Sequence, residues 1–223
     1  MCSSQEQAQP INIVVADDHP VVVVGVSKMI NELDSFRVVA TVTTISQLFN
    51  CLSELPCDVL VCDYSFEDDD EPDGLLMLEK VRRLYPSVKI ILLTAHDDLV
   101  IVQRALKVGV SGFLSKSSND TSIISNVITR VHGGEKYLDP ITTKIMIKHM
   151  MSNDVSELTL LTSQLTAREL EVVRMFSRGM SVTDIAQYTD RSVKTISTQK
   201  KQAMLKLGAG NDVELVNAFS KLF

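Results

Sequence analysis

The sequence predicts a doubly wound α/β domain with a five-stranded parallel sheet, of the flavodoxin-like type, followed by a small all-α domain. Over residues 11–131, five short apolar segments alternate with five amphipathic ones, as in a parallel sheet with helices on both faces. Residues 164–223 carry only helical spacing and helix-capping signals. The predicted organisation is a disordered tail over 1–10, the α/β domain over 11–132, a linker with a short helix over 133–163, and the helical domain over 164–223.

Five segments are expected to be buried strands because they are short, apolar and rich in β-branched residues. They cover residues 11–16, 36–42, 59–62, 88–94 and 112–116. The helices expected between and after them cover 20–33, 46–55, 73–84, 99–108 and 121–131. Pro20 suits the first turn of the first of these helices, and Gly109 ends the fourth.

Capping residues mark the helices expected in the second half. A short helix is expected from Asp139 and Pro140 through Met151. Three more helices are expected to begin at caps formed by Thr166 with Glu169, by Ser181 with Asp184, and by Ser192. Gly208 ends the third of them after Leu207, and a fourth helix is expected over 212–222. Two helices joined by a tight turn, the second of them basic, form a helix-turn-helix pattern.

Length and composition fit a globular protein of one large domain or two smaller ones. The 223 residues are 45% hydrophobic and 22% charged, and no apolar run reaches the roughly 18 residues of a membrane span. The polar first ten residues lack the basic-then-apolar order of a signal peptide, so a cytoplasmic protein is expected. The cysteines at 2, 51, 57 and 62 show no metal-ligand spacing, and the last three are expected to be reduced core residues.

Charge is divided unevenly along the chain. The net charge is −6, a value that by itself argues against nucleic acid. However, residues 1–155 carry a net −8 and residues 156–223 a net +2, and the stretch from Arg191 to Lys206 holds five basic residues and no acid. This asymmetry predicts two modules with different partners.

Polar residues stand at the carboxyl ends of four predicted strands. Asp17 and Asp18 follow the first strand, Asp63 follows the third, Thr94 closes the fourth and Lys116 closes the fifth. These ends share one edge of a parallel sheet, so the side chains are expected to converge. Each residue alone also fits a cap, a turn or a solvated strand end; their combination favours a site.

Such a set can accept a phosphoryl group on a carboxylate. Asp63 would be the nucleophile and would form an aspartyl phosphate. Three close carboxylates favour a bound cation, and oxygen ligands of this kind suit Mg2+. Mg2+ and Lys116 would neutralise charge on the transferred oxygens, and the Thr94 hydroxyl would donate a hydrogen bond.

With this order of strand-end residues, residues 11–131 resemble the receiver domain of response regulators. The resemblance implies that Asp18, Asp63 and the carbonyl of Ser65 hold the metal ion, with Asp17 nearby. It also implies that phosphorylation draws the Thr94 hydroxyl toward the phosphate. Phe113 occupies the family's aromatic switch position, and a core aromatic there is an equally good interpretation.

The loop after Asp63 departs from the receiver pattern. Most receivers carry Met-Pro three and four residues after the acceptor, where this chain has Phe66 and Glu67, and Gly74 comes late. Six acidic residues fill the insert, at 67–71 and 73. They could attract Mg2+ or repel a phosphodonor, but a solvated surface loop that does neither is favoured. The four histidines, at 19, 96, 132 and 149, do not cluster in the sequence, and no metal role is expected for them.

The helix expected over residues 193–207 has two faces. Its apolar residues, which are expected to pack on the helical bundle, are Val193, Ile196, Ala203, Met204 and Leu207. Those expected to bind DNA are Lys194, Thr195, Ser197, Thr198, Lys200, Lys201 and Lys206. A helix fits the major groove, where Lys reaches guanine and Ser or Thr reaches a base or a phosphate. A solvated basic face on a structural helix is the alternative.

Residues 166–207 resemble the DNA-binding domain of LuxR/NarL (FixJ) regulators, through Leu165-Thr-Ala-Arg-Glu-Leu-Glu-Val, Ile185-Ala, Val193-Lys-Thr-Ile-Ser and Leu205-Lys-Leu-Gly208. The late Gly74 and the Lys-Thr-Ile-Ser-x-Gln-Lys-Lys run are most similar to the Rcs-type capsule and envelope-stress regulators. The resemblance implies that Ser197, Thr198 and Lys201 face bases, while Lys194, Lys200 and Lys206 lie nearer phosphates.

These observations together predict a response regulator of a two-component system or phosphorelay, in which phosphorylation of Asp63 controls dimerisation and operator binding. The implied partners are a sensor histidine kinase or phosphotransfer protein, a second copy of the chain, double-stranded DNA and RNA polymerase. An atypical regulator that binds DNA without phosphorylation, or with an auxiliary partner protein, is the alternative. A Mg2+-dependent phosphohydrolase is disfavoured because Ser65 stands where a second acid/base Asp would be needed, so no enzyme activity is expected beyond the chain's own phosphate.

Overall fold

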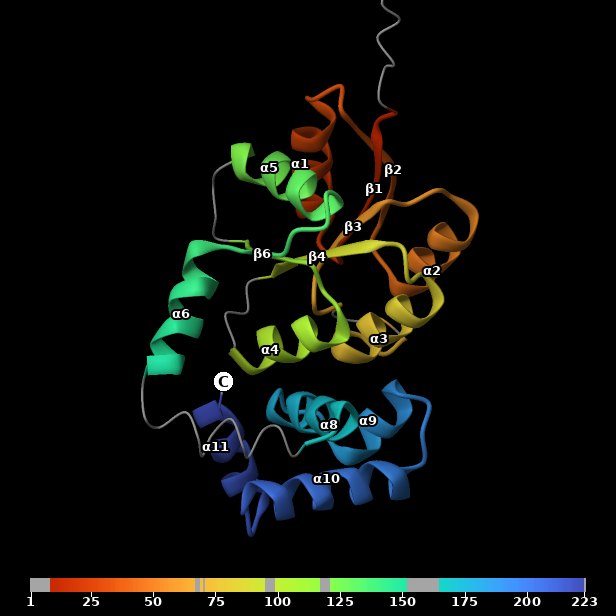
Figure 1. The fold of residues 1–223 in the computed structure, drawn as a ribbon. Coiled ribbons are helices and arrows are strands. Elements are labelled where there is room, and N and C mark those ends of the chain that lie inside the picture. Colours follow the sequence, from red (N-terminus) through yellow and green to blue (C-terminus); the bar gives the residue numbers. More distant parts are fainter. Residues whose placement is uncertain are drawn as a thin grey trace, which may run out of the picture.

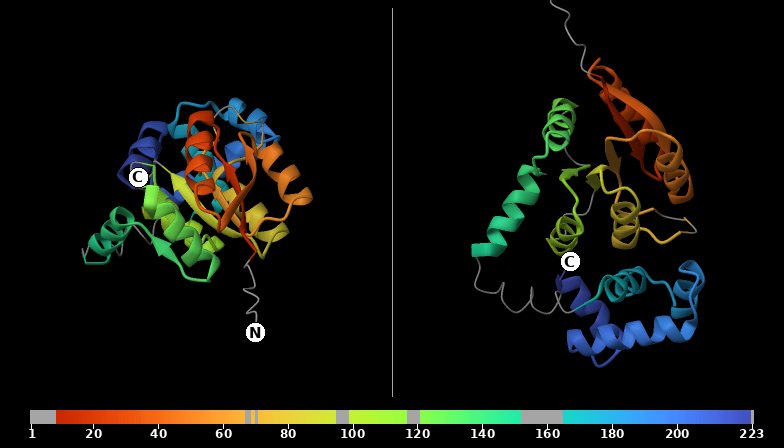
Figure 2. Two further views of the ribbon diagram at one scale, coloured as in Figure 1. Left: turned by 90° about the horizontal axis from the view of Figure 1, so that it is seen from above. Right: turned by 45° about the vertical axis from the view of Figure 1, so that its right-hand side comes forward.

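The computed structural model describes residues 9–66, 69, 71–94, 99–116, 121–151 and 165–222. An α/β domain and a helical domain lie one above the other, and helix α6 (Pro140–Met151) runs down one side (Figure 1). A second view shows the same stacking, with the helical domain below the helices that cover one face of the sheet (Figure 2). Among the described residues, no helix combines the length and apolar character needed to cross a membrane.

The sheet is parallel throughout, with the strand order β2-β1-β3-β4-β5-β6. Its strands are β1 (Ile11–Ala16), β2 (Phe36–Val42), β3 (Val59–Cys62), β4 (Lys89–Thr94), β5 (Gly112–Ser115) and β6 (Tyr137–Leu138). The fold class is confirmed, with one strand more than predicted. The sixth strand has only two residues and exists through its pairing with Gly112 and Phe113, so no apolar run announces it.

Helices cover both faces of the sheet, as in a doubly wound fold. They are α1 (Pro20–Asn31), α2 (Ile45–Glu54), α3 (Gly74–Leu84), α4 (Leu99–Val108) and α5 (Thr121–His132). Successive residues of β1 point to opposite faces: Ile13 and Val15 pack with α1 and α5, whereas Val14 and Ala16 pack with α2, α3 and α4. The strand period of two therefore supplies two apolar layers from one strand.

The second half contains α8 (Ala167–Ser177), α9 (Val182–Tyr188), α10 (Val193–Leu207) and α11 (Asp212–Leu222). The predicted capping boxes at the starts of α8 and α9 are both confirmed. Ser192 accepts from the backbone N–H of Thr195 at 3.1 Å, and Gly208 ends α10 in the left-handed conformation at φ 67°. These local signals explain why the predicted helix bounds agree with the structure to within a residue.

The small helical core lies where α8, α9 and α10 meet, and contains Val172, Met175, Ile185, Ala186 and Ile196. The expectation that Val193 packs on the bundle was wrong, because its side chain is 48% exposed. Ile196, one turn further along α10, was predicted to face the bundle as well, and it is fully buried there.

The described cysteines behave as core residues. Cys51 and Cys62 are buried, Cys57 is half-buried, and none of the three forms a disulfide. Burial raises the pKa of Cys57 to about 12, so its thiol stays protonated and unreactive at neutral pH. The prediction of reduced core cysteines is confirmed for these three residues.

Candidate functional site

The carboxyl ends of β1 and β3 bring the carboxylates of Asp17 and Asp63 together in a buried position. The two strands pair directly, Ala16 with Cys62, and the backbone N–H of Asp63 donates to the carbonyl of Ala16 at 2.9 Å. Asp17 is 1% exposed and Asp63 6% exposed. Asp17, Asp18, His19 and Asp63 each offer a ligand atom, all within 4.8 Å of one another.

Lys116, just beyond β5, provides the positive charge of this pocket. Its Nζ lies 2.7 Å from Asp63 Oδ2 and 2.6 Å from Asp17 Oδ2. Burial raises the pKa of Asp63, and the hydrogen bond from Lys116 only partly opposes that shift. Burial lowers the pKa of Lys116, but Asp17 and Asp63 outweigh it, so the net shift is upward. One ammonium faces two carboxylates, so the lysine stays charged while each acid is only partly compensated.

The donor set fits a hard divalent cation. In hydrogen-bond geometry, the buried Asp17 Oδ2 has no donor in the described part of the chain, although Lys116 Nζ is close enough for an ion pair. Asp18 adds a partly exposed carboxylate beside it. Anionic oxygens gathered in a half-open pocket are the ligands that Mg2+ prefers.

His19 is the residue of the pocket that the sequence interpretation missed. Its Nδ1 lies 2.7 Å from Asp18 Oδ1 and 3.3 Å from Asp17 Oδ1, and its side chain is 61% exposed. The hydrogen bond with Asp18 raises the pKa of His19. The sequence did contain a signal for His19, because it directly follows Asp17 and Asp18. A histidine can join a site made of carboxylates even when no other histidine is near it.

Three further predicted residues have different outcomes. Ser65 lies two residues after Asp63 and is buried. Its Oγ accepts hydrogen bonds from Arg174 in α8 and from Arg178, the residue directly after α8. Thr94 ends β4 in register with Ser115, but its side chain lies outside the described residues. Phe113 is 1% exposed, within the core, and its switch role stays a prediction.

The acidic insert is partly buried, so the favoured interpretation as a solvated loop was wrong for two of its residues. Asp69 is 8% exposed and accepts from the backbone N–H of Ile45 at 2.6 Å, at the start of α2. A helix start leaves amide donors without partners, which explains why an acid is stable there. Asp73 is 4% exposed and pairs with Arg174. Glu67, Asp68 and Asp70 lie outside the described residues.

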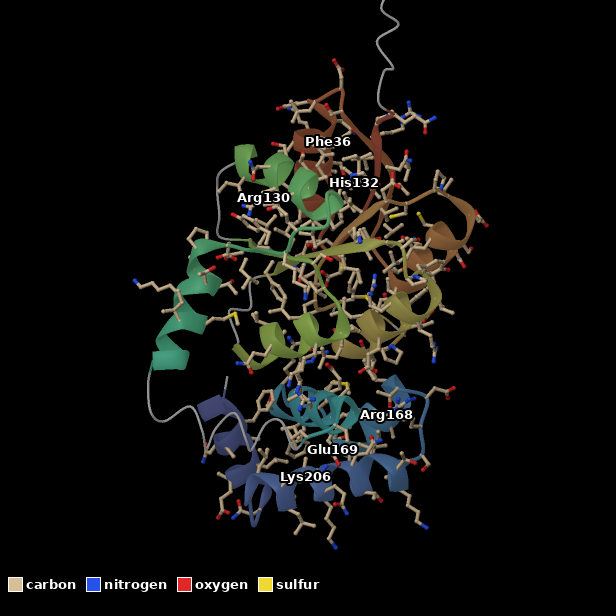
Figure 3. All side chains as sticks on the ribbon, in the orientation of Figure 1. Phe36, Arg130, His132, Arg168, Glu169 and Lys206 are labelled. Carbon is tan, nitrogen blue, oxygen red and sulfur yellow. The ribbon has the colours of Figure 1, made fainter. Side chains whose placement is uncertain are left out.

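The exposed face of α10 is directed away from the α/β domain (Figure 1). Five of the predicted DNA-binding residues are exposed along it: Lys194, Thr195, Ser197, Thr198 and Lys201. The other two lysines are paired within the domain. Lys200 Nζ lies 2.7 Å from Asp212 and over the ring of Phe176, and Lys206 Nζ lies 2.7 Å from Glu169 (Figure 3).

Known proteins share both parts of this architecture. Residues 13–128 match the family model of the response regulator receiver domain, and residues 163–219 match that of bacterial regulatory proteins of the luxR family. A receiver domain joined to a luxR-type domain defines a response regulator. The chain belongs to that family, and along its whole length it is similar to the transcriptional regulatory protein RcsB. RcsB of Salmonella typhi is 32% identical over 212 residues, which cover 95% of each chain.

Solved structures give the same answer. An RcsB structure from Salmonella typhimurium, described as showing conformational dynamism for DNA interaction, has a TM-score of 0.76 at 30% identity and covers 96% of this chain and 98% of its own. RcsB from Salmonella enterica serovar Typhimurium bound to the promoter rprA with phosphomimetic BeF3− has a TM-score of 0.73 at 31% identity, covering 95% and 99%. Two RcsB dimers bound to two parallel DNAs give 0.62 at 31% identity, covering 96% and 100%.

Proposed function

We propose that this chain is a transcription regulator whose dimerisation and operator binding are controlled by phosphorylation of Asp63. The observation that carries the proposal is a buried Asp63 beside Asp17 and Lys116, in a chain that also exposes a basic helix. The proposed division is a tail over 1–10, a receiver over 11–132, a linker over 133–163 and a DNA-binding domain over 164–223.

The phosphoryl group would come from a histidine kinase or phosphotransfer protein. A carboxylate oxygen of Asp63 attacks phosphorus, the bond from phosphorus to the donor imidazole breaks, and that imidazole takes up a proton. Asp17, Asp18, Asp63 and the Ser65 carbonyl would hold Mg2+, which supplies charge neutralisation when bound.

The chain's own groups orient this step. The backbone N–H of Tyr64 donates to Asp63 Oδ1 at 2.6 Å, and Lys116 holds Oδ2 at 2.7 Å, so both carboxylate oxygens have fixed partners. Lys116 also neutralises charge on the incoming phosphoryl oxygens. Thr94 is proposed to donate to the phosphoryl group, and Phe113 to respond to that movement. Response regulators of this kind are in general not enzymes; the only turnover proposed is slow hydrolysis of the chain's own phosphate.

The DNA contact is proposed for the exposed face of α10, where Ser197, Thr198 and Lys201 would face bases, and Lys194 and Thr195 would lie near phosphates. A lysine already held by a carboxylate releases fewer counterions on binding, so Lys200 and Lys206 are proposed as weaker contributors. The RcsB relatives bound to DNA as dimers support a homodimer on two half-sites. A cytoplasmic location and RNA polymerase as a further partner follow from this role.

Operator affinity with and without beryllofluoride tests the proposal. The probe is a duplex selected by this chain from a random-sequence pool, with dimerisation followed by light scattering. Beryllofluoride is expected to raise affinity at least about tenfold, a change of about 1.4 kcal/mol. Asp63→Ala is expected to abolish that response, while Asp34→Ala, at an exposed acid away from the pocket, keeps it. Equal affinity with and without beryllofluoride would sink the switch.

The second candidate is a regulator that acts without phosphorylation or with an auxiliary protein. Its specific support is the loop after Asp63, where Phe66 replaces the usual Met and Asp69 and Asp73 are tied to other elements. Radiolabelled acetyl phosphate decides between the two candidates. If the wild-type chain takes up no label, the second candidate is favoured. If the wild-type chain is labelled and Asp63→Ala is not, the result counts against it.

A further inference from the structure

The helical domain packs on the α/β domain through α8, and the two domains share one apolar cluster. Leu165, Leu170 and Val173 belong to the same buried cluster as Leu75 and Met77 of α3. All five residues are at most 3% exposed. Buried apolar side chains at a boundary between domains oppose the relative motion that a small polar contact would allow.

A buried charge cluster lies beside this apolar contact. Arg174 of α8 is 5% exposed and pairs with Asp73, which is 4% exposed at the start of α3. The Nε of Arg174 also donates to Glu171 Oε2 at 2.8 Å. Breaking such a buried pair strands an uncompensated charge, so the contact holds strongly once made.

Glu171 completes the end of a helix in the other domain. Its Oε1 accepts from the Tyr64 hydroxyl at 3.0 Å and from the backbone N–H of Leu75 at 3.2 Å. Leu75 is the second residue of α3, where amide donors have no partner inside their own helix. An acid from the helical domain therefore caps a helix of the α/β domain.

Gly74 makes this approach possible. Its φ is +62°, and an added Cβ would lie 2.7 Å from Glu171 Oε1. Only glycine combines that backbone conformation with room for the carboxylate. The glycine that arrives late in the sequence is thus placed for the contact with Glu171.

The segment after Asp63 carries the rest of the contact. Ser65 Oγ accepts from Arg174 at 3.1 Å and from Arg178 at 3.3 Å. The hydroxyl of Tyr188 in α9 donates to the carbonyl of Glu71 at 3.4 Å. Loop residues on both sides of Phe66 therefore face α8 and α9, whereas the exposed face of α10 is on the opposite side of the domain (Figure 1).

We propose that Tyr64, Asp73 and Gly74 of the α/β domain and Glu171 and Arg174 of α8 form a latch that stays closed when the chain binds DNA. The acidic insert and the late Gly74 are the receiver half of this latch. With the latch closed, the exposed face of α10 is already open to the duplex. The two domains therefore bind DNA without separating from each other. The statement about the DNA-bound state rests on the proposed function. The contacts of the latch are present in the chain without DNA.

Amide exchange of Leu75, followed by NMR, reports the state of the latch. The Tyr85 amide, bonded to Val81 at the other end of the same helix, is the internal reference. Tyr64→Phe and Asp73→Asn keep the side-chain shapes. The first removes a hydrogen bond to the buried Glu171 carboxylate, and the second removes the charge of one partner of a buried ion pair. Each is expected to accelerate Leu75 exchange at least about tenfold. Asp34→Asn, at an exposed acid, is the matched control. Unchanged Leu75 exchange in both variants overturns the latch and leaves the proposed function standing.

The second measurement adds the selected duplex at saturation. Leu75 exchange in the wild-type chain is expected to stay within about twofold of the free value, far from the tenfold that marks an open contact. Acceleration of tenfold or more on DNA, with Tyr85 unchanged, overturns the closed latch alone. A chain that selects no duplex overturns the proposed function and this inference with it.

Discussion

At the residue scale, the imidazole of His19 stands at the mouth of the acidic pocket, in contact with Asp18 and Asp17. Its position is exposed, so solvent screens the interaction. The hydrogen bond with Asp18 nevertheless raises the pKa of His19. This stabilisation is therefore full below a pH of about 6.5 and is lost as the pH rises through the higher folded value.

An NMR titration of the His19 ring checks this shift. The midpoint is expected above about 6.5, the ordinary value for histidine. Asp18→Asn is expected to bring the midpoint back toward that value. A midpoint for His19 at or below the ordinary value would contradict the assigned hydrogen bond.

Two adjacent lysines of α10 differ in what holds them. Lys201 is exposed, whereas Lys200 is paired with Asp212 and packed over Phe176. Lys201→Ala is expected to weaken operator binding and to reduce the slope of log affinity against log salt by about 1. Lys200→Ala is expected to change that slope by less than half as much, and to lower domain stability instead. Equal slopes for the two variants would show that the pair with Asp212 opens on DNA.

At the scale of single elements, the start of α3 depends on Gly74. Gly74→Ala is expected to lower the free energy of unfolding by more than Gly134→Ala, as measured by urea denaturation. Both glycines have positive φ, but a Cβ at Gly134 would meet nothing within 4 Å. Both alanines therefore carry backbone strain of about 1 kcal/mol, and only Gly74→Ala also displaces Glu171. The excess is expected to vanish in a Glu171→Ala background; an excess that persists would place its cause elsewhere.

The elements with strong local signals could be predicted from the sequence. Capping boxes at Thr166 and Ser181 and the short β-branched strands need only their own neighbours in the chain, and they agree with the structure closely. The two-residue β6 could not be predicted, because its pairing with β5 and not its composition makes it a strand.

The candidate site divides in the same way. Asp17, Asp63 and Lys116 could be placed together because parallel strands share one carboxyl edge. His19 was missed although it follows the Asp pair directly. The burial of Asp69 and Asp73 could not be predicted, because their partners, the start of α2 and Arg174 of α8, are distant in the sequence and no periodicity connects them.

At the scale of the whole molecule, the shared apolar cluster and the buried pair of Asp73 with Arg174 join the stabilities of the two domains. Calorimetry of the wild-type chain is expected to give one unfolding transition. Asp73→Asn removes one partner of a buried pair, a loss of about 3–5 kcal/mol, and is expected to separate the transition into two. Asp34→Asn is expected to keep a single transition. Two resolved transitions in the wild-type chain would contradict the coupling.

The contact between Tyr64 and Glu171 joins residues 107 positions apart, and this separation has a consequence in polymer terms. Forming it closes a long loop of chain, but the entropic cost of closure grows only with the logarithm of loop length, by about 0.6 kcal/mol for each doubling. The contact therefore depends little on how long the connection between the domains is. Relatives could lengthen or shorten that connection and keep the same contact between the domains, provided that the latch residues on both domains stay complementary.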